Sequence, residues 1–78
     1  MPVVTMEDIT KLVSLQLGIR KVGLQDRLLE DLGAESADVA NLVAAVEEKY
    51  QITVKESEIA KIFTPEDLFA LIRERMSL

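Results

Sequence analysis

The strongest helical pattern in the chain occupies residues 36–50, which read SADVANLVAAVEEKY. Apolar side chains recur there at helical spacing and share one face. They are Val39, Leu42, Val43, Val46 and Tyr50. Burying such side chains contributes about 1.5–3 kcal/mol each, while ordering the backbone costs a comparable amount of entropy. We therefore expect this helix to form only when it packs against other helices.

Three further helical patterns flank this segment. The first begins near Thr5, a suitable N-cap, and ends at Gly18. A short helix is expected over residues 56–62. The last helix has the sharpest start in the chain, because the capping residue Thr64 is followed by Pro65 and two acidic residues.

Residues 19–35 form a long connection without a clear period. Such a long connection is unusual in a small domain and is often functional. Its leucines predict that it packs on the helices, and the chain shows no strand-like alternation. We therefore expect one all-α domain spanning residues 1–78. It would be a small bundle of three longer helices and one short helix, with a long first loop.

The composition argues against self-contained catalysis. The 78 residues include no cysteine and no histidine, which removes disulfides, thiolate metal sites and the commonest general base. The best case for acid–base or metal chemistry is the carboxylate group of Glu30, Asp31 and Glu35. Loop carboxylates of this kind are usually solvated, and no metal-loop spacing is present. We expect no catalytic and no metal-ligating residue, and hence a protein that is not an enzyme.

The net charge of −5 and the pI near 4.6 indicate the kind of partner. An acidic surface disfavours nucleic acid, because phosphates repel it, and it favours basic patches on other proteins. The first residues lack the pattern of a signal peptide, and no apolar stretch is long enough to cross a membrane. We expect a cytoplasmic monomer without membrane insertion, or a matrix protein if a transit peptide has been removed.

Residues 31–37 read DLGAESA, which resembles the D-L-G-A/x-D-S-L attachment motif of the acyl carrier protein family. The similarity extends to residues 42–50, LVAAVEEKY, which resemble the family's L-V-x-x-x-E-E-x-F pattern. Residues 52–54 and 62–68 resemble the approach to the family's last helix. The resemblance covers most of the chain and implies the acyl-carrier-like helical bundle.

The resemblance also implies a mechanism. A phosphopantetheinyl transferase would move the 4'-phosphopantetheine arm from coenzyme A onto Ser36, and the thiol of the arm would hold an acyl group as a thioester. The protein would serve fatty-acid-like or specialised lipid and secondary biosynthesis, and its partners would be acyl-transferring or acyl-modifying enzymes with basic docking patches. The residues alone leave Ser36 an ordinary N-cap as well, and they do not separate the classes of cargo.

Several residues depart from the family pattern. Glu35 replaces the usual aspartate and is a poorer N-cap, so we expect Ser36 to take over the capping. Ala37 replaces a leucine that contacts partner enzymes in the family, and Asn41 replaces an acidic residue. The residues expected to bind partners are Glu35, Ala37, Asp38, Asn41, Glu47 and Glu48. For the acidic ones, an ordinary solvated surface is the alternative.

Small residues are predicted near the inner faces of the helices, at Ala40, Ala44, Ala45 and Ala60. They would leave room for an acyl chain, or they would allow close helix packing without a cavity. A second function class also stays open. In it the chain keeps the carrier fold without a prosthetic group and binds a partner enzyme as a scaffold, which the unusual Glu35 and Ala37 favour.

Overall fold

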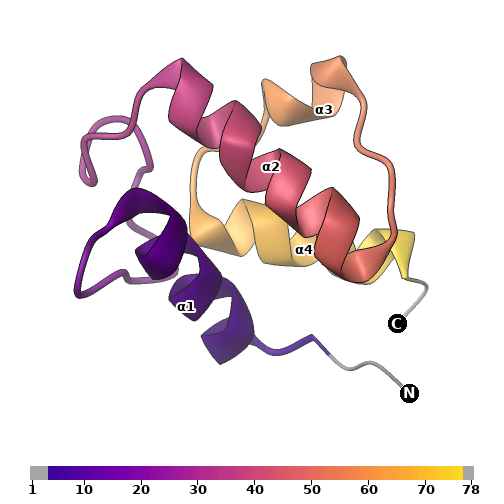
Figure 1. Cartoon of the computed structure of the whole chain (residues 1–78), viewed down its shortest axis with the longest axis horizontal. Helices are drawn as coiled ribbons and strands as arrows, with labels where there is room; N and C mark the ends of the chain where they lie inside the picture. The colour runs from indigo at the N-terminus through magenta and orange to yellow at the C-terminus, as the bar shows by residue number, and fades with distance from the viewer. Residues whose placement is uncertain (1–3, 77–78) are drawn as a thin grey trace.

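The computed structural model describes residues 4–76 and contains four helices. They are α1 (Met6–Leu17), α2 (Ser36–Tyr50), α3 (Glu56–Ile59) and α4 (Pro65–Arg75). No strand occurs between residues 4 and 76. The all-α prediction of three longer helices, one short helix and a long first loop is therefore confirmed (Figure 1). The expected domain of residues 1–78 includes residues 1–3 and 77–78, which lie outside the described part.

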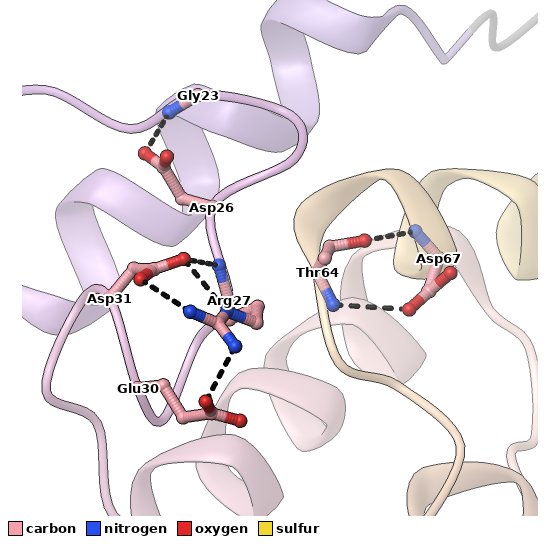
Figure 2. A network of polar contacts seen from close by, with 7 residues as sticks. All are labelled: Gly23, Asp26, Arg27, Glu30, Asp31, Thr64 and Asp67. Carbon is pink, nitrogen blue, oxygen red and sulfur yellow. Dashed lines mark hydrogen bonds and ion pairs between the residues drawn. The ribbon is translucent and has the colours of Figure 1, made fainter.

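The helix starts that depend on local capping lie where the sequence placed them. At α1, Thr5 Oγ1 accepts a hydrogen bond from the N–H of Asp8 at 3.1 Å, and Asp8 Oδ2 accepts from the N–H of Thr5 at 3.0 Å. Thr64 and Asp67 exchange the same pair of bonds at α4, at 3.2 and 3.1 Å (Figure 2). These reciprocal bonds satisfy amide groups that a helix start leaves unpaired. Gly18 ends α1 with a φ of 67°, a conformation that favours glycine.

The short helix α3 is shorter than predicted. It ends at Ile59, whereas residues 56–62 were expected to be helical. Beyond it the backbone continues in tight turns, in which the N–H of Ile62 donates to the carbonyl oxygen of Ile59 at 3.1 Å. Ile62 is thereby buried without belonging to the helix.

The core lies between α1, α2 and α4. Helix α1 packs against both α4 and α2, and α3 contacts α2. The apolar stripe predicted for α2 faces this core, since four of its residues are buried and Tyr50 is half-buried. The fully or nearly buried side chains at its centre are Ile9, Val13, Leu28, Leu42, Val43, Val46, Leu68 and Ile72. No helix within residues 4–76 has the length and apolarity needed to cross a membrane.

The long loop between α1 and α2 packs on the bundle, as predicted. Leu28 is only 1% exposed, and its N–H donates to the carbonyl oxygen of Phe63 at 2.8 Å. The N–H of Glu66 donates to the carbonyl oxygen of Leu24 at 3.0 Å. These two bonds hold the loop against the start of α4, so the residues that precede α2 have a defined position.

Candidate functional site

Ser36 is the first residue of α2 and is exposed. The N-cap is Glu35, whose backbone is extended and whose side chain makes no capping hydrogen bond. The expectation that Ser36 caps the helix is therefore wrong. The cap is instead closed by Asp38, whose Oδ2 accepts from the N–H of Glu35 at 2.9 Å. The Ser36 hydroxyl is thus not required for the helix start.

The chain reaches Ser36 through a turn that needs glycine. Gly33 has a φ of 69°, a left-handed conformation that strains other residues. No atom lies within 4 Å of where a Cβ would be, so the requirement comes from the backbone and not from space. The N–H of Ala34 then donates to the carbonyl oxygen of Leu28 at 2.9 Å. This turn presents Ser36 at the end of the bundle rather than inside it.

The start of α2 is a favourable place for an anion. The backbone N–H groups of Asp38 and Val39 donate to the carbonyl oxygen of Glu35. Those of Ser36 and Ala37 precede the first bonds of the helix and have no carbonyl within it to pair with. Unpaired amides and the helix dipole together favour a phosphate at this end. A phosphodiester on the Ser36 hydroxyl therefore fits the residues around it.

A pocket of about 560 Å³ opens beside Ser36. Three parts of the chain line it: the first loop, the start of α2, and the segment from α3 toward α4. Its lining residues are Arg27, Leu29, Glu30, Ser36, Val39, Glu56, Ile59, Ala60, Ile62 and Phe63. Its walls are largely apolar, and charged side chains stand among them. The site therefore joins an exposed hydroxyl to a space for an apolar chain.

Arg27 organises the loop on one side of this pocket (Figure 2). Its Nη1 lies 2.6 Å from Glu30 Oε2, and its Nε lies 3.2 Å from Asp31 Oδ2. Asp31 Oδ2 also accepts from the backbone N–H of Arg27 at 2.8 Å. These hydrogen bonds lower the pKa of Asp31 and raise the pKa of Arg27. Both groups therefore stay charged near neutral pH.

This pairing also bears on whether the three loop carboxylates could act in acid–base or metal chemistry. Glu30 and Asp31 face Arg27, while Glu35 is exposed at the start of α2. An aspartate with a lowered pKa does not serve as a general acid near neutral pH. Within residues 4–76, no group of three or more His, Cys, Asp or Glu side chains is arranged to hold a metal ion.

The residues predicted to bind partners divide into free and engaged side chains. Glu35, Ala37, Asn41 and Glu48 are exposed, whereas Asp38 and Glu47 are half-buried. Asp38 caps α2, and Glu47 Oε2 accepts from the N–H of Val54 at 2.9 Å, which fixes the connection toward α3. Charge reversal at Glu47 would therefore disturb the fold as well as any partner contact.

The small residues do not lie where the sequence analysis placed them. Ala40 and Ala44 are exposed, and Ala45 is half-buried. The buried face of α2 is formed by Val39, Leu42, Val43 and Val46. Ala40 and Ala44 lie on the other side of the helix. Ala60 is exposed too, but it lines the pocket.

Sequence reasoning missed several residues that shape the site. Arg27, Leu29, Glu56 and Phe63 all line the pocket, although none shares a helix face with Ser36. Leu29 and Phe63 are 50% and 63% exposed. No local pattern in the sequence identifies them, because the first loop, the start of α2 and the segment after α3 come together only in the tertiary fold.

Known proteins are similar to this chain over most of its length. The family model for the phosphopantetheine attachment site matches residues 7–72. The acyl carrier protein of Campylobacter concisus (strain 13826) is 37% identical over 70 residues, which cover 87% of this chain and 91% of that protein. The acyl carrier protein of Helicobacter hepaticus (strain ATCC 51449 / 3B1) is 40% identical over 70 residues, covering 87% and 92%.

Solved structures share the fold at lower identity. The 3-oxo-butyl-ACP of the actinorhodin polyketide synthase from Streptomyces coelicolor has a TM-score of 0.76 and 20% identity, with 97% of this chain and 94% of that chain covered. The oxytetracycline acyl carrier protein has a TM-score of 0.77 and 21% identity, with 99% and 86% covered. Because the sequence relatives are similar over most of both chains, this chain belongs to the acyl carrier protein family.

Proposed function

We propose that Ser36 is the residue to which the 4'-phosphopantetheine arm of this carrier is attached. One observation supports this most directly: Ser36 is exposed at the first position of α2, directly beside the 560 Å³ pocket. Its hydroxyl does not cap the helix, because Glu35 is the N-cap and Asp38 accepts the hydrogen bond from the N–H of Glu35. A transferase therefore has access to it without unfolding α2.

Membership in the family means that this chain carries acyl groups and is not itself an enzyme. The cofactor of the family is a covalent 4'-phosphopantetheine, whose thiol supplies the reactive group that a chain without cysteine lacks. The protein's own contribution is to present the arm and to shelter what it carries. We propose that residues 1–78 form one domain with this task.

We propose that the pocket beside Ser36 receives the acyl group. Val39, Ile59 and Ile62 contribute apolar side chains to its walls. Each methylene that leaves water for such a site contributes up to about 0.8 kcal/mol. An acyl chain on an arm that starts at Ser36 would therefore be stabilised by folding back into this pocket.

The family's partners are phosphopantetheinyl transferases and acyl-processing enzymes. We propose that those of this chain dock through basic patches, since Glu35 and Glu48 are exposed acids on and beside α2. We further propose a cytoplasmic monomer that serves fatty-acid-like or specialised lipid and secondary biosynthesis. Sedimentation, cell fractionation and the identity of acyl groups on protein purified from its source test these finer points.

The attachment itself is tested by intact mass. The chain is incubated with coenzyme A and a phosphopantetheinyl transferase of broad specificity, alongside Ser36→Ala and Ser57→Ala. Ser57 is a matched control, because it too is an exposed serine in the first turn of a helix. The wild-type chain and Ser57→Ala should each gain one arm, and Ser36→Ala should gain none.

The same measurement separates the scaffold alternative. If the wild-type chain gained no arm with several transferases, a carrier fold retained for binding a partner enzyme would be the better account. In that case Ser36→Ala would leave partner binding unchanged. Equal mass gain in the wild type and Ser36→Ala would instead assign the arm to another residue.

A further inference from the structure

Two of the exposed large apolar side chains stand together beside Ser36. Within residues 4–76, Met6, Leu15, Leu29 and Phe63 are the large hydrophobic residues that are at least half exposed. Leu29 and Phe63 both line the pocket that Ser36 lines, whereas Met6 and Leu15 lie on α1. We refer to Leu29 and Phe63 as the apolar lip.

The two residues come from segments that are far apart in the chain. The N–H of Leu28 donates to the carbonyl oxygen of Phe63 at 2.8 Å, so the backbones next to the lip are held together. Leu28 is buried and anchors its side of the contact in the core. The lip is therefore a fixed feature of the fold, not a chance exposure on a free loop.

The pocket that the lip lines carries more acidic than basic side chains. Glu30 and Glu56 line the same pocket, and Glu35 is exposed next to Ser36. The one cation among the lining residues is Arg27, and it is already paired with Glu30 and Asp31. Two carboxylates and one guanidinium thus line the pocket, so its lining carries a net charge of −1.

An exposed phenylalanine beside charged side chains is typical of a protein-binding surface, and Leu29 enlarges the apolar area of the same pocket. Such surfaces are enriched in aromatic residues and have a polar, solvent-accessible rim. On the α2 side of Ser36, the exposed neighbour is Ala37, which offers only a methyl group. The large apolar contact available beside the hydroxyl is therefore the lip.

We propose that the apolar lip formed by Leu29 and Phe63 is a docking surface for the enzymes that act at Ser36. The matching partner surface is an apolar pocket framed by arginine or lysine, which complements the net negative charge of the lining. This proposal rests on the proposed attachment at Ser36 and deepens it, because it assigns partner recognition to the loop side of the hydroxyl as well as to α2.

Transferase kinetics on the chain before it carries an arm test this directly, because no acyl group is then present. Coenzyme A is kept saturating, and the concentration of Phe63→Ser, Leu29→Ser or wild-type chain is varied. Leu15→Ser is the matched control, since Leu15 is 71% exposed and lies away from the pocket. Phe63→Leu tests whether apolar bulk alone restores binding, and thermal melting of each variant confirms that it is folded.

Phe63→Ser should raise the KM for the carrier about tenfold while kcat changes by less than about twofold, as expected for a lost docking contact. Leu29→Ser should raise KM in the same direction. Leu15→Ser should leave both constants near those of the wild type, and Phe63→Leu should recover most of the affinity.

Three outcomes overturn this proposal while leaving the proposed function intact. The first is a KM for Phe63→Ser that matches the KM of Leu15→Ser. The second is a Phe63→Ser chain whose KM equals that of the wild type and whose melting temperature is lower than that of the wild type only when both are acylated. This would show that the lip covers the acyl group. The third is a dimer of the wild-type chain that Phe63→Ser dissociates, which would assign the lip to a second copy. A wild-type chain that gains no arm at all would overturn the proposed function, and this proposal with it.

Discussion

The backbone N–H of Leu28 donates a hydrogen bond to the carbonyl oxygen of Phe63, with an N···O distance of 2.8 Å. This contact joins the loop before α2 to the segment before α4. Leu28 is 1% exposed and belongs to the core, while the next residue, Leu29, is 50% exposed and lines the pocket beside Ser36. The loop thus uses one leucine for stability and the next for the site.

Truncating Leu28 should therefore be costly. Leu28→Ala removes a fully buried side chain, and large-to-small changes in a core cost about 2–5 kcal/mol. Leu15→Ala changes a residue that is 71% exposed and should cost less than about 0.5 kcal/mol. The free energy of unfolding of both variants is measured by urea denaturation. Equal losses would mean that the loop does not share the core.

The bond between Arg27 and Asp31 should give stability a specific dependence on pH. The hydrogen bond from Arg27 holds the pKa of Asp31 below its ordinary value. A carboxylate whose pKa is lower in the folded state stabilises the fold above its unfolded pKa, near 3.9. That contribution is lost as the pH falls through the lower, folded pKa.

Asp31→Asn tests this dependence. The wild type should melt at a higher temperature than Asp31→Asn near neutral pH, and the difference should shrink below about pH 4. Glu48→Gln, which alters an exposed acid on α2, is the control and should show a smaller difference. If the difference in melting temperature between the wild type and Asp31→Asn widened as the pH fell, the stabilising role of the Arg27–Asp31 pair would be contradicted.

Filling the pocket with a larger side chain should reduce the stabilisation that acylation gives to the chain. Ala60 lines the pocket beside Ser36, whereas Ala44 is exposed on α2 and does not. Acylation should raise the melting temperature of the wild-type chain, because apolar surface of the cargo is buried. Ala60→Leu should reduce this rise, and Ala44→Leu should preserve it. Equal rises in both variants would argue against an acyl chain in this pocket.

Tyr50 carries a hydroxyl that is buried without a hydrogen-bond partner among the described residues. Burial, together with the negative charge of Asp8, raises the pKa of this hydroxyl. A buried polar group without a partner costs stability. Tyr50→Phe keeps the ring, so it should leave the free energy of unfolding unchanged or raise it by up to about 1 kcal/mol. A loss of similar size, measured by urea denaturation, would show that the hydroxyl is satisfied.

The parts of the fold that depend on residues close together in the sequence were predictable. The start of α4 at Thr64 and Asp67, and the end of α1 at Gly18, follow from capping rules that act over a few residues. The start of α2 was placed correctly at Ser36, but its cap was not. Glu35 occupies the N-cap, and Asp38 closes the turn from three residues ahead.

The parts that depend on tertiary contacts were not predictable in this way. A hydrophobic residue just before an N-cap usually packs on the fourth residue of the helix, here Leu68. Phe63 occupies that position and is nonetheless 63% exposed at the pocket. The pocket combines side chains from the first loop, α2 and the segment after α3, and no local pattern reports that these segments meet.

Locating the arm on the chain tests the central claim most directly. Trypsin cleaves after Arg27 and Lys49, and the resulting peptide, residues 28–49, contains Ser36 as its sole hydroxyl side chain. Mass analysis of the modified protein after digestion should place the whole phosphopantetheine on this peptide, with fragmentation assigning it to Ser36. An arm found on a peptide that contains Ser14 or Ser57, with residues 28–49 unmodified, would contradict the attachment site.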